Sequence, residues 1–477
     1  MNIYNNLLKY YRQNTVFVIS FIFSIITYLF YLYFRGFGWD GDSFISASQF
    51  VKIINRNLYY ATIDGGAHPK LFTVIIFGAI YQVTGGFYLL TFISIIINAL
   101  MISSLTNWIS REKGIWLIAL FGLLINIPWT KIVINCDNTA FSIPLIVIGL
   151  YLISKDKYYV GALLLIISNF FRTGSEFVIF ILIIYTLYQK KFKHVIILGI
   201  SLSITLMHSY WGYLLVYPSR EIFWNNCWAF RVSPETIAKY QYSIKAIIPY
   251  LHSIFKQLLT KYSIIFIIPA ILGLIRILKN HSKITLAILI PLGSLILPVS
   301  TFLYGTILIT LETKHMGYTI LLPVLAAFSF DSSIFKMLGQ KTKVFFTSGI
   351  LLLVILFSAF TGKLKQREYE AHINGTGTIG WTNFPNIKKD IESMYPSENI
   401  TILTAYQYLT FITLDIGKYA NNIDVVKDIA DIDYNKINSY DLIIIPNSWN
   451  FDINKLSSKD FRIKNNLQSN YLYLFKK

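Results

Sequence analysis

The chain has 477 residues, 55% of them hydrophobic, with a mean hydropathy of +0.54 and a formal net charge of +18. Soluble domains rarely exceed about 50% apolar residues, so this composition excludes an ordinary soluble protein. Residues 361–477 hold 14 basic and 13 acidic residues, which leaves 28 basic and 11 acidic residues in the apolar part. That surplus is typical of cytoplasmic loops in a membrane protein and argues against nucleic-acid binding, which needs a basic face on a soluble module.

Apolar runs predict about eleven membrane-spanning helices within residues 15–360. Lys9 and Arg12 precede the first of them, which indicates a cytoplasmic N-terminus. Residues 71–81 are too short to span and are followed by Gly85-Gly86, so we expect an interfacial or re-entrant helix there. If that helix does not cross the membrane, every basic loop between the expected spans is cytoplasmic. The expected spans are 15–34, 87–105, 115–134, 139–153, 159–171, 175–188, 194–216, 262–277, 284–304, 316–330 and 344–360.

The polar stretch 361–477 predicts a small extracytoplasmic α/β domain. Short β-rich runs at 400–404, 442–445 and 471–475 indicate strands, and 405–419 suits a helix between the first two. This stretch has no glycine-rich phosphate loop and no metal-spaced His/Cys cluster, which favours a binding or lid role over catalysis. The chain therefore divides into a membrane domain, 1–360, and this C-terminal domain.

The first outer loop, 35–86, carries Asp40, Asp42 and His68. Carboxylates are costly beside hydrocarbon, so acids at a membrane exit are usually kept for chemistry or ion handling. A carboxylate can take a proton from a hydroxyl nucleophile or hold a divalent cation. The plainer interpretation is a solvated turn at Asp-Gly-Asp-Ser and a helix start at His68-Pro69.

A second acid and a deep cation follow in later loops. Asp137 precedes the 139–153 helix, where it can cap the helix, take part in chemistry, or do both. Arg172 lies in the turn between two short spans, and charge at that depth needs protein or a water-filled cavity around it. Pairing with Glu176, one helical turn later, is the competing interpretation for Arg172.

Further cations lie in the outer half. Arg220, Lys314 and His315 could bind a phosphate or pyrophosphate head group. A surface pair between Arg220 and Glu221, and snorkelling of Lys314 and His315 at the bilayer interface, are the alternatives.

The layout over roughly 15–360 resembles the GT-C glycosyltransferase superfamily. More closely, it resembles the bacterial branch related to dolichyl-phosphate-mannose protein mannosyltransferases and lipid A aminoarabinose transferases. The sequence departs from the family pattern at two positions: Lys70 stands where the family often has a second proline, and Ser43 where it often has glutamate. The resemblance is carried by Asp42-Ser-Phe-Ile-Ser-Ala, His68-Pro69-Lys70-Leu71, Asn135-Cys-Asp137-Asn, Asn169-Phe-Phe-Arg172-Thr and Lys314-His-Met-Gly-Tyr318 with Pro323.

The resemblance implies an inverting glycosyltransferase in the cytoplasmic membrane of a bacterium or archaeon. It would move a sugar from a polyprenyl-phosphate donor to a hydroxyl of a glycan, lipid or protein acceptor at the outer face. Asp42 would be the catalytic base, and Arg172 and Lys314 would stabilise the departing phosphate. Some members need a divalent cation (Mg²⁺ or Mn²⁺), which Asp40 and Asp137 would hold. The substrate-binding set implied is Asp40, Asp137, His68, Arg172, Arg220, Lys314 and His315.

Two other functions remain open from the sequence. A transporter or flippase for a lipid-linked oligosaccharide would use the same basic residues. It would also be expected to carry polar or charged residues deep in many spans, and often an internal inverted repeat, and the sequence shows neither clearly. A polymerase of such oligosaccharides would share most of the chemistry at the outer face.

Overall fold

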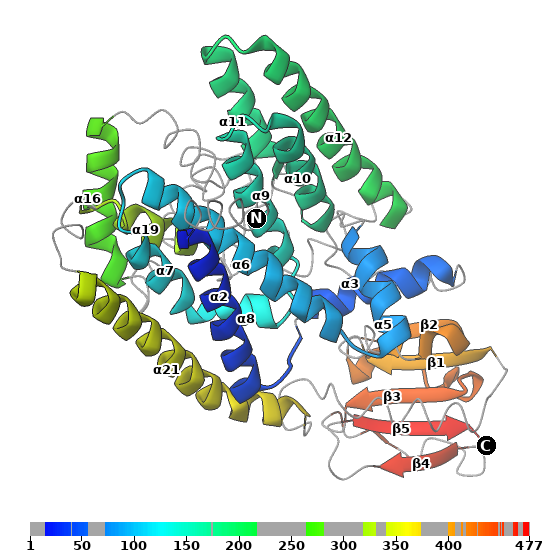
Figure 1. The fold of residues 1–477 in the computed structure, drawn as a ribbon. Coiled ribbons are helices and arrows are strands. Elements are labelled where there is room, and N and C mark those ends of the chain that lie inside the picture. Colours follow the sequence, from blue (N-terminus) through cyan, green and yellow to red (C-terminus); the bar gives the residue numbers. More distant parts are fainter. Residues whose placement is uncertain are drawn as a thin grey trace, which may run out of the picture.

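The computed structural model shows a mostly helical protein with a small five-stranded sheet near the C-terminus (Figure 1). Its description covers residues 15–39, 41–55, 72–172, 175–216, 264–280, 318–330, 340–373, 399–405, 412–413, 416–426, 428–446, 449, 451–452, 461–465 and 471–476. The span expected at 284–304 lies outside these residues, so it stays a prediction.

Three helices of the described part are long and apolar enough to cross a membrane. They are α2 (Thr15–Arg35), α6 (Tyr88–Arg111) and the segment Val344–Gln366 of α21 (Gln340–Ile373). The surface of the helical part is apolar as well: Phe345 on α21 is 82% exposed, and Ile268 on α16 (Ile264–Asn280) is 71% exposed. Extended apolar surface of this kind is expected against lipid rather than water, so the helices indicate a membrane protein.

Most of the shorter expected helices are present. The described part contains α9 (Thr139–Ile153), α10 (Tyr158–Phe171), α11 (Ser175–Tyr188) and α12 (Phe192–Val216) close to their expected bounds. The segment expected to be interfacial is a short π-helix, η1 (Thr73–Phe77), that continues into α5 (Gly78–Thr84). Gly85 ends it with a φ of 68°, a left-handed conformation that glycine adopts without strain. The last expected helix before α21 is shorter than 316–330, because α19 covers Tyr318–Ala326.

The span expected over 115–134 is two helices rather than one. They are α7 (Trp116–Leu124) and α8 (Ile127–Ile134), and their axes differ by 63°. The Asn126 side chain accepts a 3.2 Å hydrogen bond from the Trp129 N–H, so it caps a new helix at this point. Pro128 lies in the first turn of α8, a position where its missing N–H costs no helical hydrogen bond. The apolar run alone did not reveal this break.

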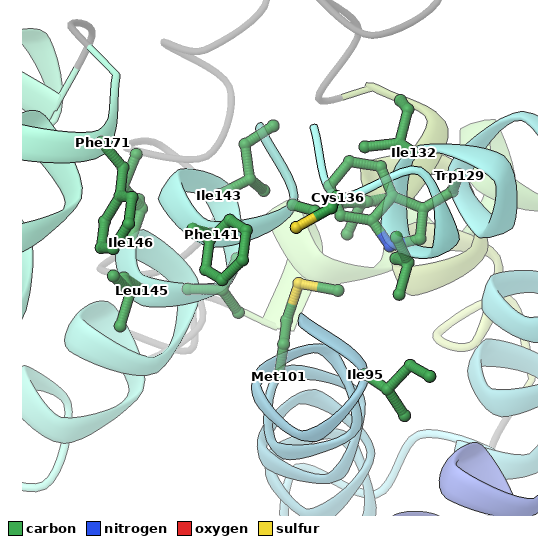
Figure 2. Packing of buried hydrophobic residues seen from close by; sticks show 14 of the residues in the cluster. Ile95, Met101, Trp129, Ile132, Cys136, Phe141, Ile143, Leu145, Ile146 and Phe171 are labelled. Carbon is green, nitrogen blue, oxygen red and sulfur yellow. The ribbon is translucent and has the colours of Figure 1, made fainter. Parts of the chain in front are cut away.

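The core of the helical part lies around α6, α8 and α9. Figure 2 shows Met101 of α6, Trp129 of α8 and Phe141 of α9 pointing toward one another, with Cys136 between the last two. The Phe141 ring stacks on the Phe171 ring at 5.0 Å, which joins α9 to the end of α10. The loop between α8 and α9 is therefore enclosed by packed side chains.

The sheet has the strand order β2-β1-β3-β5-β4. Strands β1 (Ile400–Ala405), β2 (Ala420–Val426) and β3 (Leu442–Pro446) run parallel. Strand β5 (Tyr471–Lys476) is antiparallel to both β3 and β4 (Phe461–Asn465). The three strands expected from the sequence are confirmed. Strand β2 was missed because its Asn and Asp residues have low β-propensity.

Helix α3 (Gly41–Ile54) joins the helical part to the sheet (Figure 1). Just after its end, the Asn55 amide donates hydrogen bonds to the carbonyl oxygens of Gly417, at 3.0 Å, and Ala420, at 3.2 Å. Helix α21 runs to Ile373, beyond residue 360 where the membrane domain was expected to end. Of the helix expected at 405–419, the described residues show helical turns at 412–413 and 416 and a 3₁₀ turn at Gly417–Tyr419.

Candidate functional site

Of the candidate catalytic and substrate-binding residues, the structure describes two side chains, Asp137 and Arg172. Asp42 belongs to the first turn of α3, and only its backbone is described. The remaining candidates lie outside the described residues, so their roles stay predictions: Asp40, His68, Arg220, Lys314 and His315.

Asp137 is completely buried in the loop between α8 and α9. The chain reaches it through Cys136, whose φ of 59° is left-handed and reverses the backbone after α8. The Asp137 Oδ1 accepts a 2.6 Å hydrogen bond from the Thr139 N–H, one of the donors that the first turn of α9 would otherwise leave unsatisfied. Asp137 therefore supports the start of α9, as expected, but from the residue before the N-cap, which is Asn138.

Arg172 lies against the same loop. It follows the last residue of α10 in an extended conformation, with φ −160° and ψ 133°. Its Nη1 is 3.9 Å from the Asp137 Oδ1 and donates a hydrogen bond to the Thr139 hydroxyl. The Arg172 side chain is 15% exposed while Asp137 is fully buried, so the cation lies on the more open side of the pair.

The first turn of α3 is held beside this pair. The Ser43 hydroxyl donates a 2.7 Å hydrogen bond to the Cys136 carbonyl oxygen. The backbone of Asp42 is therefore one residue from an anchor on the loop that carries Asp137. A further long-range hydrogen bond joins η1 to the end of α10, next to Arg172: the Thr73 hydroxyl donates to the Phe171 carbonyl oxygen at 3.0 Å.

Small polar side chains of α6 fix the two ends of the acidic loop. The Ser94 hydroxyl donates to the Val133 carbonyl oxygen at 2.9 Å, before the loop. The Asn98 amide donates to the Ala140 carbonyl oxygen at 2.8 Å, after the loop. All of these groups are buried, where interhelical hydrogen bonds of this kind help to join apolar helices. Sequence reasoning missed these residues, although polar side chains inside an apolar helix were the available signal.

A second buried polar cluster lies between α10, α11 and α12. The Asn169 amide donates a 2.6 Å hydrogen bond to the Glu176 Oε2, and its Oδ1 lies 2.9 Å from the His208 Nδ1. Since Asn169 presents its NH₂ group to Glu176, its oxygen accepts, and His208 carries a proton on Nδ1. The cluster bridges residues on both sides of Arg172 and fixes the turn that holds it. Glu176 thus has Asn169 as a partner, whereas the sequence suggested Arg172.

The pair and its surroundings offer one buried carboxylate, one cation and the start of α3. Such a set can bind an anionic group at Arg172 and position a hydroxyl at the acids. Among the described residues, no group of three or more His, Cys, Asp or Glu side chains could hold a metal ion. A cation at Asp40 and Asp137 stays a prediction, because Asp40 is outside those residues.

A comparison with protein-family models matched no family, and a comparison with curated proteins found no match.

Proposed function

We propose that this protein is a membrane glycosyltransferase of the GT-C type that uses a polyprenyl-phosphate sugar as its donor. The observation that carries the proposal is the Asp137–Arg172 pair, at 3.9 Å, next to the anchored first turn of α3 that contains Asp42. The backbone of Asp42 is thus held next to the loop of Asp137 and Arg172, and sugar transfer from a lipid phosphate requires acids and a cation near one another.

The chemistry assigns each group a separate task. An acceptor hydroxyl attacks the anomeric carbon, and the bond from that carbon to the phosphate oxygen breaks with inversion. Asp42 takes the hydroxyl proton as general base. The electron pair goes to the departing phosphate, whose charge Arg172 stabilises through fixed, bidentate N–H donors. Asp137 holds Arg172 in place from the buried side.

The surrounding architecture supports a lipid-linked donor. Exposed apolar side chains cover several helices, so a polyprenyl tail can remain in the bilayer while its phosphate reaches Arg172. We place the site at the outer face of the cytoplasmic membrane, with the sheet domain on the same side. A reporter fused after residue 477 is then expected to report an extracytoplasmic end, and a cytoplasmic signal would contradict this orientation.

The direct test is transfer by the purified full-length protein in lipid nanodiscs. We expect label to move from radiolabelled polyprenyl-phosphate sugars to cell-envelope glycans or lipids, with release of polyprenyl phosphate. Asp42→Asn should abolish transfer at unchanged protein abundance. Asp156→Asn is the matched control, because Asp156 is 78% exposed in the loop between α9 and α10. Full transfer by Asp42→Asn would overturn the base assignment.

A flippase for a lipid-linked oligosaccharide is the second candidate. The buried Asn169, Glu176 and His208 cluster favours it, because polar groups inside apolar helices often mark a transport path. The same nanodisc experiment separates the two functions when repeated in sealed vesicles. Movement of intact labelled lipid across the bilayer, with no transfer of its sugar, would support the flippase. A polymerase would instead lengthen a lipid-linked chain of repeat units.

A further inference from the structure

The loop between α8 and α9 contains a buried amide that has no hydrogen-bond partner. Asn138 is 0% exposed, and neither its Oδ1 nor its Nδ2 has a partner in the described part of the chain. It is the one amide of that part for which both atoms are in this state. The Oδ1 of Asn135, three residues earlier and 8% exposed, is in the same state.

Such groups destabilise a protein unless something satisfies them. Buried polar atoms in native structures almost always have a partner, and each exception calls for an explanation, such as a ligand or a bound water. Two other buried amides of the described residues each keep a partner: the Asn107 amide donates to the Tyr151 hydroxyl at 3.0 Å, and the Asn98 Nδ2 donates to the Ala140 carbonyl oxygen at 2.8 Å although its Oδ1 has no partner. Buried atoms without a partner also occur elsewhere in the described residues, and Asn138 is distinguished by lacking a partner at both atoms of its amide.

The position of Asn138 points to the ligand. It lies between Asp137 and Thr139, two residues whose side chains contact the Arg172 guanidinium. A group whose phosphate is bound by Arg172 would bring its next atoms to this loop. Asn138 offers both an acceptor and a donor, which is the pattern that a hydroxyl satisfies from both sides. A metal ion fits poorly, since Nδ2 carries hydrogens and the Arg172 cation is close.

We propose that Asn138, with Asn135, binds hydroxyl groups of the sugar on the lipid-phosphate donor. The inference rests on the proposed function, and it goes further by assigning sugar recognition to two amides on either side of Asp137. The unpaired amide atoms gain hydrogen-bond partners only when the sugar is bound. The protein without donor is therefore less stable, and in return it selects for a donor that carries the right sugar hydroxyls. A site built to hydrogen-bond hydroxyls rejects ligands that lack them.

The test compares two probes on the full-length protein in nanodiscs. One is short-chain polyprenyl phosphate, and the other is the same lipid carrying mannose, glucose or arabinose. We expect the wild type to bind one sugar-bearing lipid more tightly than the others. Asn138→Ala should raise the dissociation constant for that lipid about tenfold. Binding of polyprenyl phosphate should not change. Without ligand, the thermal midpoint of Asn138→Ala should equal or exceed that of the wild type, because unsatisfied atoms have been removed.

Asn107→Ala is the matched control, since it removes a buried amide that does have a partner. It should lower the thermal midpoint and leave the preference for the sugar-bearing lipid unchanged. The inference would be overturned if the thermal midpoint of Asn138→Ala fell as far as that of Asn107→Ala. It would also be overturned if Asn138→Ala weakened the binding of both lipids equally. Neither outcome would contradict the proposed transfer activity. If Mg²⁺ or Mn²⁺ alone raised the thermal midpoint of the wild type but not that of Asn138→Ala, the ligand of Asn138 would be a cation, and the inference of sugar binding would be wrong. A wild type that binds no sugar-bearing lipid better than polyprenyl phosphate would overturn the proposed function together with this inference.

Discussion

The Ser43 hydroxyl and the Cys136 carbonyl oxygen, 93 residues apart in the sequence, are joined by a 2.7 Å hydrogen bond. The bond ties the first turn of α3 to the loop of Asp137. Both partners are buried, so the hydrogen bond is shielded from competing water. This contact fixes the start of α3, which carries the backbone of the proposed base, relative to the loop of Asp137.

Ser43→Ala should therefore reduce transfer without preventing folding. Losing one buried hydrogen bond costs about 1 kcal/mol of unfolding free energy, whereas a small displacement of a catalytic group can cost up to about a hundredfold in rate. We expect at least a tenfold loss of the transfer rate, measured with labelled donor. Ser48→Ala is the control on the same helix, because the Ser48 hydroxyl donates to the Ile45 carbonyl oxygen within α3. Equal activity of the Ser43 and Ser48 variants would contradict a positioning role for Ser43.

Arg172→Ala should weaken donor use and stability together. The change leaves the fully buried Asp137 carboxylate without its cation, and breaking a buried pair from one side typically costs about 3–5 kcal/mol. Since Arg172 is partly exposed, we expect the lower end of that range. The Michaelis constant for the donor should rise much more than that for the acceptor.

Two further variants complete the test of Arg172. In Arg172→Ala combined with Asp137→Asn, part of the lost stability should return, and a double-mutant cycle measures this coupling. Lys191→Ala is the control, because the Lys191–Asp156 pair is exposed and should contribute less than about 1 kcal/mol. Equal rises of the donor and acceptor Michaelis constants would argue against phosphate binding by Arg172.

The Asn169–Glu176 hydrogen bond predicts different outcomes for two substitutions of Glu176. Glu176→Gln keeps an oxygen that accepts from the Asn169 amide, whereas Glu176→Leu leaves that buried amide without this acceptor. We expect Glu176→Leu to lower the unfolding free energy by about 1–3 kcal/mol and Glu176→Gln by less. Thermal unfolding in detergent measures the difference. A loss in Glu176→Gln equal to that in Glu176→Leu would show that the charge matters more than the hydrogen bond.

Tyr440 gives the sheet domain a predictable response to alkaline pH. Burial, together with the Asp424 carboxylate that accepts its hydroxyl at 2.7 Å, raises the pKa of Tyr440 above its ordinary value. A raised folded-state pKa means that the protonated phenol stabilises the fold. That contribution is complete below the ordinary tyrosine pKa of about 10 and is lost as pH rises through the folded-state value.

Alkaline titration of the full-length protein, followed by tyrosinate absorbance and thermal midpoint, checks this response. The wild type should lose stability at a pH above 10, with Tyr440 among the tyrosines that ionise late. Tyr440→Phe should be less stable at neutral pH, because the hydroxyl that donates to Asp424 is gone. Its thermal midpoint should then fall less than that of the wild type as the pH is raised further. Identical pH profiles of the two proteins would rule out Tyr440 as the group responsible.

The apolar helices could be predicted well where a run of hydrophobic residues ends in polar ones. The bounds of α9 and α11 match the sequence expectation, since Asn138 and Ser154 enclose one run and Gly174 and Gln189 the other. The bend between α7 and α8 escaped prediction, because the run around Asn126 stays apolar on average and the break depends on local capping. Strand β2 escaped for a related reason: its pairing with β1 overrides the poor β-propensity of its Asn and Asp residues.

The site was predictable as a set of residue types but not as an arrangement. Asp137 and Arg172 were each singled out by depth and charge, yet their 3.9 Å approach depends on how α9 and α10 pack. Ser43 and Asn138 carried no signal in the sequence, since one resembles a turn residue and the other a helix cap. Long-range hydrogen bonds and unsatisfied buried atoms become visible only in three dimensions.

Helix α3 is fastened at both ends, by Ser43 to the acidic loop and by Asn55 to the edge of the sheet. Its 14 residues extend about 21 Å as one stiff rod. Removing the chain from Ile400 onward would delete both carbonyl acceptors of the Asn55 amide. A truncated protein would thus keep one of those two attachments. The effect of losing the tail would appear far from it, at the start of α3 beside the loop of Asp137.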